Sequence, residues 1–177
     1  MSKKTSRGAA SSASAATKKS QKSSISKSAF SPSYLQLSLF ASVVQGFESQ
    51  HLRIHDTSTG RLRCEHAAAA RARITSLAWG YYGTSYRESQ QENSKKKRKR
   101  DQDGGGHVVV AYGSNTSDIC MFSPAEGKIV CMLSGVHEQG IKDFQFVVDD
   151  QSQGWSIGGD AKLVQWDLTS NTATRYV

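Results

Sequence analysis

A serine, a histidine and an aspartate stand near the end of the chain, in a set that could carry out nucleophilic chemistry. Ser156 precedes Asp160 by four residues, and His137 lies upstream of both. A hydroxyl beside an imidazole that a carboxylate orients is an activated nucleophile. Trp166, six residues after Asp160, has no part in such a reaction, but its indole N–H needs a partner when buried. We therefore interpret the four side chains as a buried structural network and expect no enzyme activity.

The charge of the chain lies mostly in two segments. The formal net charge is +8, and residues 1–28 contribute six Lys and one Arg with no acid. Residues 87–103 add seven basic and four acidic groups. The remainder is close to neutral, which favours a basic tail and a basic loop over a basic binding face built into the fold. Because residues 1–28 contain almost no large apolar side chain, we expect this tail to be disordered.

Several classes of protein are disfavoured by the residue types present. The three cysteines, Cys64, Cys120 and Cys131, are widely spaced and form no CxxC pair, which fits a reducing, intracellular compartment. No apolar run approaches the length of a membrane-spanning helix, and the N-terminus lacks the apolar core of a secretory signal. His51 and His55 share one face of a strand, but no third ligand stands at a suitable spacing. We expect no metal and no cofactor.

Short apolar runs separated by Gly, Ser, Thr, Asp and Asn predict strands throughout the chain after residue 30. No segment there shows the periodicity of an amphipathic helix. The sequence therefore predicts an all-β fold. The expected strands lie within 38–46, 51–56, 61–66, 73–80, 107–113, 118–123, 128–135, 140–148, 154–159, 162–167 and 172–177.

The strands recur at a fixed interval. Asp167 lies 44 residues after Ser123, whereas Ser123 lies 67 residues after Asp56. The excess of 23 residues is the length of segment 84–106, whose composition differs from that of the strands. With this insertion set aside, a unit of about 44 residues repeats three times. A period of 40–45 residues with four strands per unit is typical of a WD40 propeller blade.

The last unit resembles the WD40 repeat in detail. The resemblance implies a buried chain in which the Trp166 indole N–H bonds the Ser156 hydroxyl, Ser156 bonds His137, and His137 bonds Asp160. It assigns Asp167 to the tight turn that leaves the strand. The expected blades span about 29–72, 73–135 and 136–177. Because propellers need about four to eight blades to remove exposed edges, we interpret them as the N-terminal part of a seven-bladed ring.

The first two units depart from the WD40 pattern. The second unit has Thr116 in place of the turn aspartate and Phe122 in place of the tryptophan, and the first has Ser49 and His55. These units are expected to depend on apolar packing alone.

A run of six cations lies within the insertion, and it favours three interpretations. Short Lys/Arg clusters in accessible chain serve as nuclear localisation signals, which is the interpretation we prefer. A merely solvated charge run and a contact with RNA phosphates remain open. Base stacking is not supported, because no aromatic residue interleaves with the cations. The cations are Lys95, Lys96, Lys97, Arg98, Lys99 and Arg100.

Residues 29–177 also resemble a narrower family. The wording "HLRIHDTSTGRL", the basic insertion directly after "ITSLAWG", and "VAYGSNTSDICMFSPAEGKIVCMLSG" are similar to the WD-repeat family numbered five among the U3 small nucleolar RNA-associated proteins. That family belongs to the UTP-A (t-UTP) subcomplex of the small-subunit processome, or 90S pre-ribosome. The resemblance implies a noncatalytic nucleolar scaffold in pre-18S rRNA processing. It also implies assembly on the 5′ external transcribed spacer and support of rDNA transcription.

The implied partners are other UTP-A subunits, processome proteins and pre-rRNA, contacted directly or indirectly. No membrane and no small-molecule substrate is expected. The alternative is a WD40 peptide-binding adaptor or substrate receptor in another nuclear complex, since propeller faces offer rigid docking surfaces for many unrelated functions.

Overall fold

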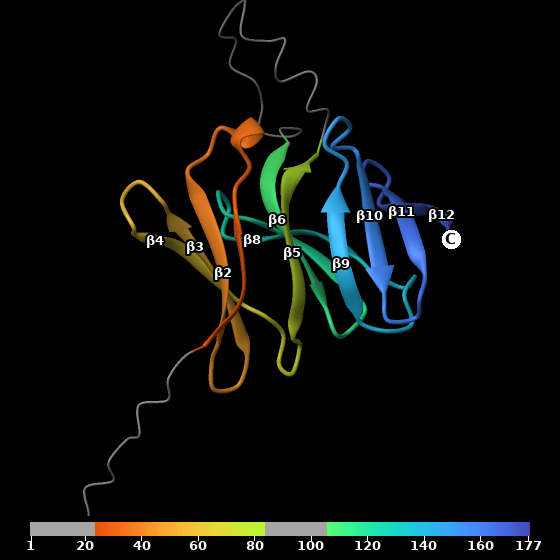
Figure 1. Ribbon diagram of the computed structural model, residues 1–177, viewed down its shortest axis with the longest axis horizontal. Coiled ribbons are helices and arrows are strands. Elements are labelled where there is room, and N and C mark those ends of the chain that lie inside the picture. Colours follow the sequence, from red (N-terminus) through yellow and green to blue (C-terminus); the bar gives the residue numbers. More distant parts are fainter. Residues whose placement is uncertain (1–23, 84–105) are drawn as a thin grey trace, which may run out of the picture.

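Three four-stranded antiparallel sheets make up the computed structural model of the chain. The structure describes residues 24–83 and 106–177. Within these ranges there is no α-helix, and the one helical segment is a short 3-10 turn, η1 (Ser33–Leu35). Each sheet takes four strands that are consecutive in the chain. Figure 1 shows the sheets following one another from the orange N-terminal strands to the blue C-terminal ones. The predicted all-β fold, built of successive four-stranded antiparallel units, is confirmed.

The first sheet has the order β1-β2-β3-β4. Its strands alternate apolar and polar residues, as half-buried strands do. The alternation in β3 buries Leu52 and Ile54 completely, while the residues between them are half-buried. The strands are β1 (Ile25–Phe30), β2 (Leu39–Gln45), β3 (Gln50–Asp56) and β4 (Leu62–Ala67).

β1 begins inside the range 1–28 that was expected to be disordered. Its sequence offers only Ile25 and Phe30 as large apolar residues, and both are exposed. The strand forms because its backbone pairs with β2 from Phe30↔Phe40 to Ile25↔Val44. Backbone pairing with an existing strand edge can therefore order a segment that has little apolar surface to bury.

The second sheet comprises β5 (Ile74–Tyr82), β6 (His107–Ser114), β7 (Ile119–Ser123) and β8 (Lys128–Leu133). Residues 84–105 join β5 to β6, so the predicted insertion, 84–106, lies outside the described residues except for Gly106. Val109 and Val110 in β6 are both fully buried. Because this sheet is covered on both faces, the sequence of β6 contains a continuous apolar run.

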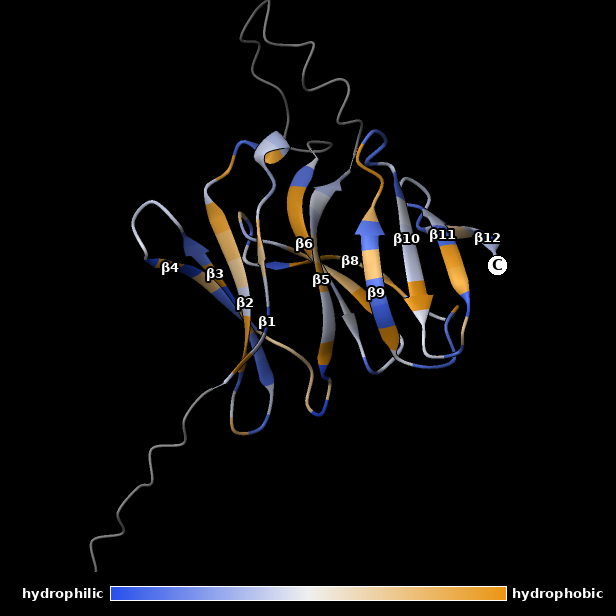
Figure 2. Cartoon of the chain, viewed as in Figure 1, coloured by the Kyte–Doolittle hydropathy of each residue, from blue (hydrophilic) through white to orange (hydrophobic). Residues whose placement is uncertain are grey.

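The third sheet comprises β9 (Ile141–Phe146), β10 (Gln153–Gly158), β11 (Leu163–Asp167) and β12 (Thr172–Tyr176). Along β9, Figure 2 shows hydrophobic and hydrophilic residues in alternation. Two clusters of buried side chains hold the sheets together. One lies between the first and second sheets, around Ile54 and Phe122, and the other between the second and third, around Met121 and Phe144.

Candidate functional site

Four side chains, two from strands of the third sheet and two from its adjoining loops, lie close together. His137 lies in the loop before β9, Ser156 in the middle of β10, Asp160 in the turn after β10, and Trp166 in β11. Trp166 lies opposite Gly154 on the neighbouring strand, so the indole can extend along β10 towards Ser156. We refer to His137, Ser156, Asp160 and Trp166 as the polar relay.

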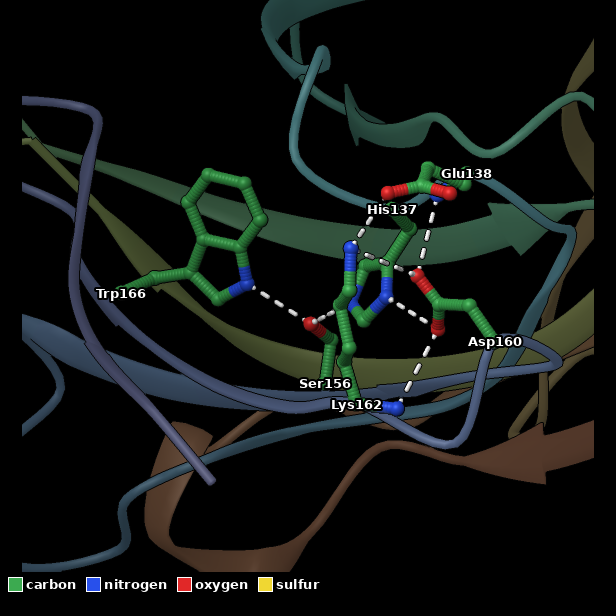
Figure 3. A network of polar contacts seen from close by, with 6 residues as sticks. All are labelled: His137, Glu138, Ser156, Asp160, Lys162 and Trp166. Carbon is green, nitrogen blue, oxygen red and sulfur yellow. Dashed lines mark hydrogen bonds and ion pairs between the residues drawn. The ribbon is translucent and has the colours of Figure 1, made fainter.

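The polar relay is a continuous chain of hydrogen bonds (Figure 3). Trp166 Nε1 donates to Ser156 Oγ at 2.7 Å, and Ser156 Oγ lies 2.7 Å from His137 Nε2. His137 Nδ1 lies 3.1 Å from Asp160 Oδ1. An ionised carboxylate only accepts, so His137 carries a proton on Nδ1. In the neutral imidazole Nε2 then accepts from the Ser156 hydroxyl. Every polar side-chain atom of the polar relay therefore has a complementary partner.

Asp160 is held as a carboxylate by several donors. Burial of the carboxyl opposes its ionisation, but the backbone N–H of Glu138, the His137 side chain and the backbone N–H of Lys162 donate to it. Together these hydrogen bonds lower the pKa of Asp160 to about 2. Lys162 Nζ lies 3.9 Å from Asp160 Oδ2 and 2.6 Å from Glu138 Oε1, and closes the network on its solvent side.

Gly158 is a member of the site that the sequence analysis did not single out. A Cβ atom at this position would overlap Asp160 Oδ1 and His137 Nδ1. A glycine is needed there because the relay passes directly over the backbone. The repeated Gly residues of "GWSIGG" were the available signal.

Ser156 also stands in a G-x-S-x-G pattern, formed by residues 154–158. In a nucleophile elbow that serine occupies a strained turn between a strand and a helix, with an exposed hydroxyl. Here the whole pattern lies within β10, and Ser156 is 1% exposed. Its hydroxyl oxygen already accepts the Trp166 N–H. This geometry suits a buried structural link and leaves no approach for a substrate.

Asp167 lies in a turn that all three sheets repeat. Its Oδ1 accepts the backbone N–H of Thr169 at 2.8 Å, as Asp56 Oδ1 accepts that of Ser58 at 2.9 Å. In the second sheet Ser123 Oγ accepts from the backbone N–H of Glu126 at 3.3 Å. The fifth residue of each turn has a positive φ: Gly60 at 69°, Gly127 at 67° and Asn171 at 57°. These residue types tolerate the left-handed region best.

The first two sheets do not depend on apolar packing alone, so that expectation was wrong. Trp79 Nε1 donates to the Ala29 carbonyl at 3.1 Å, and the Ile74 N–H donates to Gln50 Oε1 at 2.6 Å. His66 Nε2 lies 3.0 Å from Tyr112 Oη, and its ring stacks on Phe122. Polar side chains thus join the first sheet to the second.

The residues that replace the relay in these sheets have other contacts. Thr116 Oγ1 bonds Ser114 Oγ at 2.7 Å, and Phe122 is fully buried. Ser49 Oγ lies 3.4 Å from His51 Nε2, and His51 Nδ1 lies 2.6 Å from Glu65 Oε1. His55 Nδ1 is buried and has no hydrogen-bond partner among the described residues.

Lys95 to Arg100 lie outside the described residues. In the ranges that the structure describes, no group of three or more His, Cys, Asp or Glu side chains could hold a metal ion. Nor does any helix there have the length and apolar character to cross a membrane.

Comparison with known proteins gives the fold its name. No family model and no curated protein matches the sequence. Among solved structures, U3-55K and the RRP9 WD40 repeats each superpose with a TM-score of 0.61 at 12% identity, over 90% of this chain and 40% of theirs. A chain of the mitotic checkpoint complex gives a TM-score of 0.56 at 17% identity, over 79% of this chain and 35% of that one.

These likenesses show a fold and no more. The three sheets have the architecture of consecutive blades in a WD40 β-propeller. The chain spans about 40% of the length of the first two neighbours, so it holds part of such a ring.

Proposed function

We propose that this chain is a noncatalytic scaffold subunit of the UTP-A (t-UTP) complex in the small-subunit processome. Its work would be early assembly on the 5′ external transcribed spacer, pre-18S rRNA processing and support of rDNA transcription, in the nucleolus. The observation that carries the proposal is the place of the basic insertion: it joins β5 to β6, directly after the wording that resembles the UTP-A family. The propeller fold supports it, because propellers present rigid docking surfaces.

In this proposal the polar relay has a structural role. Its members are almost fully buried: the side chains of His137 and Asp160 are 1% and 5% exposed. A satisfied buried network rigidifies the elements that it joins. The relay would fix the loop before β9 and the turn after β10 against the sheet, and so give the docking surface at this end of the blade one defined shape.

The six cations of the insertion are proposed to act in nuclear import. The test is a full-length tagged chain in cells, with Lys95, Lys96, Lys97, Arg98, Lys99 and Arg100 all changed to Gln. We expect the unchanged chain to concentrate in nucleoli and to copurify with pre-18S RNA, and the variant to remain outside the nucleus. A diffuse cytoplasmic distribution of the unchanged chain would contradict the proposal.

A second variant separates import from RNA contact. An unrelated nuclear localisation signal is fused to the six-fold Gln variant. If copurification with pre-18S RNA returns, the cations act as a signal. If the protein reaches the nucleolus but RNA does not copurify, they contact phosphates, and the salt dependence of RNA binding should be shallower for the variant.

The second candidate is a peptide-binding adaptor in another nuclear complex. The mitotic checkpoint complex chain among the structural neighbours favours it, since that chain shares the fold within a multiprotein assembly. Affinity purification followed by RNA sequencing and mass spectrometry distinguishes the two. Processome proteins together with pre-rRNA support the scaffold, whereas a protein assembly without pre-rRNA supports the adaptor.

A further inference from the structure

The outer strand of the second sheet has an edge that further blades would leave uncovered. β5 packs beside both β1 and β9 (Figure 2), so these three strands lie innermost, and β4, β8 and β12 lie outermost. Blades before the first sheet or after the third would extend the row of sheets at its two ends. β8 belongs to the middle sheet, which already has a neighbour on each side. Its outer edge therefore faces away from the row whether or not more blades are present.

The main chain of β8 is unpaired along this edge. Among the described strands β8 pairs only with β7. Within the described ranges, none of the backbone hydrogen bonds outside the sheets involves residues 128–133. An edge strand presents alternate N–H and C=O groups with which another extended chain can pair. The hydrogen-bonding groups of this edge are thus arranged to accept a further strand.

Charged residues stand in the other two outer strands but are missing from most of β8. β4 carries Arg63 and Glu65, and β12 carries Arg175. Residues 129–133 of β8 are Ile, Val, Cys, Met and Leu. Natural proteins use charges on an exposed edge to keep other strands from pairing with it. All three outer strands have a β-bulge at the same level, so β8 is distinguished by its lack of charge and not by its backbone.

Two side chains beside this edge indicate what an added strand would contact. Met132 lies opposite Cys120, which packs in the cluster between the first and second sheets. Met132 therefore lies on the side of β8 that faces the first sheet, and it is 59% exposed. Arg63 is the bulge residue of β4, as Val130 is of β8, and Val130 packs towards the following sheet. By the same geometry Arg63 projects from β4 towards the second sheet. It is exposed and forms no ion pair within residues 24–83 and 106–177.

We propose that β8 is the docking edge for an extended segment of a partner protein, which adds to the second sheet as a fifth strand. The segment has apolar residues at alternate positions, which cover Met132, and an acidic residue, which pairs with Arg63. Main-chain hydrogen bonds give the affinity, and these side-chain contacts give the specificity. A second copy of the chain does not meet this description, because its own β8 offers no acid to Arg63.

The test selects random peptides of about eight residues, the length of a strand, displayed on phage against the purified chain. No processome component takes part, so the result is separate from the proposed complex. We expect enriched peptides to alternate apolar residues and to contain Asp or Glu. A selection that enriches no peptide, or only basic ones, overturns the proposal.

A matched pair of variants locates the binding edge. Strand pairing aligns Met132 with Glu65 in β4 and with Tyr176 in β12. Met132→Glu should weaken the enriched peptides about tenfold or more, because it places a charge on the edge. Tyr176→Glu, at a 58% exposed residue, should bind them like the unchanged chain. Fluorescence polarisation measures both, and circular dichroism checks that both fold. Peptides that bind Met132→Glu unchanged overturn the proposal.

Modified peptides test the strand geometry and the charge. Only alternate N–H groups of an added strand face β8, so N-methylation of one alternate set of amides should abolish binding and N-methylation of the other set should not. Equal binding by the two methylated peptides would rule out strand addition. Arg63→Glu should weaken the acidic peptide and favour the same peptide with Lys in place of its acid. If Arg63→Glu binds both forms as the unchanged chain does, the partner is not acidic, and the proposal fails.

Discussion

The third and first sheets place different chemistry at the same positions, and they show two ways to stabilise a blade. In the third sheet Trp166 reaches Ser156, and the polar relay is buried. In the first sheet, strand pairing places His55 and Ser42 at those two positions. The shorter imidazole leaves its Nδ1 without a partner in the described chain. The polar contacts there lie instead among His51, Glu65 and Arg53, whose side chains are about a third exposed.

This difference shows that burial, more than the number of hydrogen bonds, decides how much a network contributes to the stability of its sheet. A buried network that loses a member leaves other groups unsatisfied and without water. An exposed ion pair that loses a member is replaced by solvent at little cost. The third sheet should therefore be sensitive to substitution in its relay, and the first sheet should tolerate changes in its charged cluster.

The largest difference between the two sheets is expected in the free energy of unfolding, when the aligned residues Trp166 and His55 are each changed to phenylalanine. Trp166→Phe removes the N–H that Ser156 accepts and leaves a cavity, and should lower the free energy of unfolding by about 2 kcal/mol. His55→Phe removes an unpaired nitrogen and should leave stability within about 0.5 kcal/mol of wild type or raise it. The second sheet has Phe122 at this position. Urea denaturation at low protein concentration measures both, and equal losses would contradict the comparison.

The charge of Asp160 is expected to have a smaller effect, on how the stability of the fold depends on pH. Its pKa in the folded chain, about 2, is below that of an unfolded aspartate at about 3.9. The unfolded state therefore binds a proton first as the pH falls, and the stability that the carboxylate contributes is present above pH 4 and lost between about pH 4 and pH 2. In Asp160→Asn this part of the pH profile should flatten. Thermal melting between pH 2 and pH 6 checks it, and a variant profile parallel to wild type would contradict it.

The smallest effect is expected in the first sheet. Hydrogen bonding and charge from Arg53 lower the pKa of Glu65, with a contribution from His51. Because the side chains are about a third exposed, Glu65→Gln should cost about 0.5 kcal/mol or less. The difference from wild type should shrink further in 1 M salt, which screens exposed charges. A cost comparable to that of Trp166→Phe would show that the exposed cluster matters as much as the buried relay.

Strand positions and the fold could be predicted from the sequence because both depend on local patterns. Alternation in β3 and β9 and the turn residues at Gly60 and Gly127 mark the strands, and the spacing from His137 to Trp166 marks the blade. β1 was assigned to the tail because its order comes from pairing with β2, which leaves no apolar signature in residues 25–30.

The contacts between sheets could not be predicted in the same way. His66 and Tyr112 are 46 residues apart, and Trp79 and Ala29 are 50 apart. Neither pair follows a repeat or a spacing rule, since each arises only where two sheets happen to face each other. Gly158 was missed for a related reason: the need for a glycine appears only once His137 and Asp160 are seen to pass over it.

The hydrogen bonds between the sheets influence which substitutions the protein can tolerate. Trp79 bonds a main-chain carbonyl, and the Gln50 and Gln151 side chains accept from main-chain N–H groups at Ile74 and Tyr81. Every residue type except proline offers the same main-chain groups. In each of these three hydrogen bonds only one partner is a side chain, so a substitution opposite the anchor that preserves the packing, such as one at the buried Ile74, needs no compensating change at the anchor.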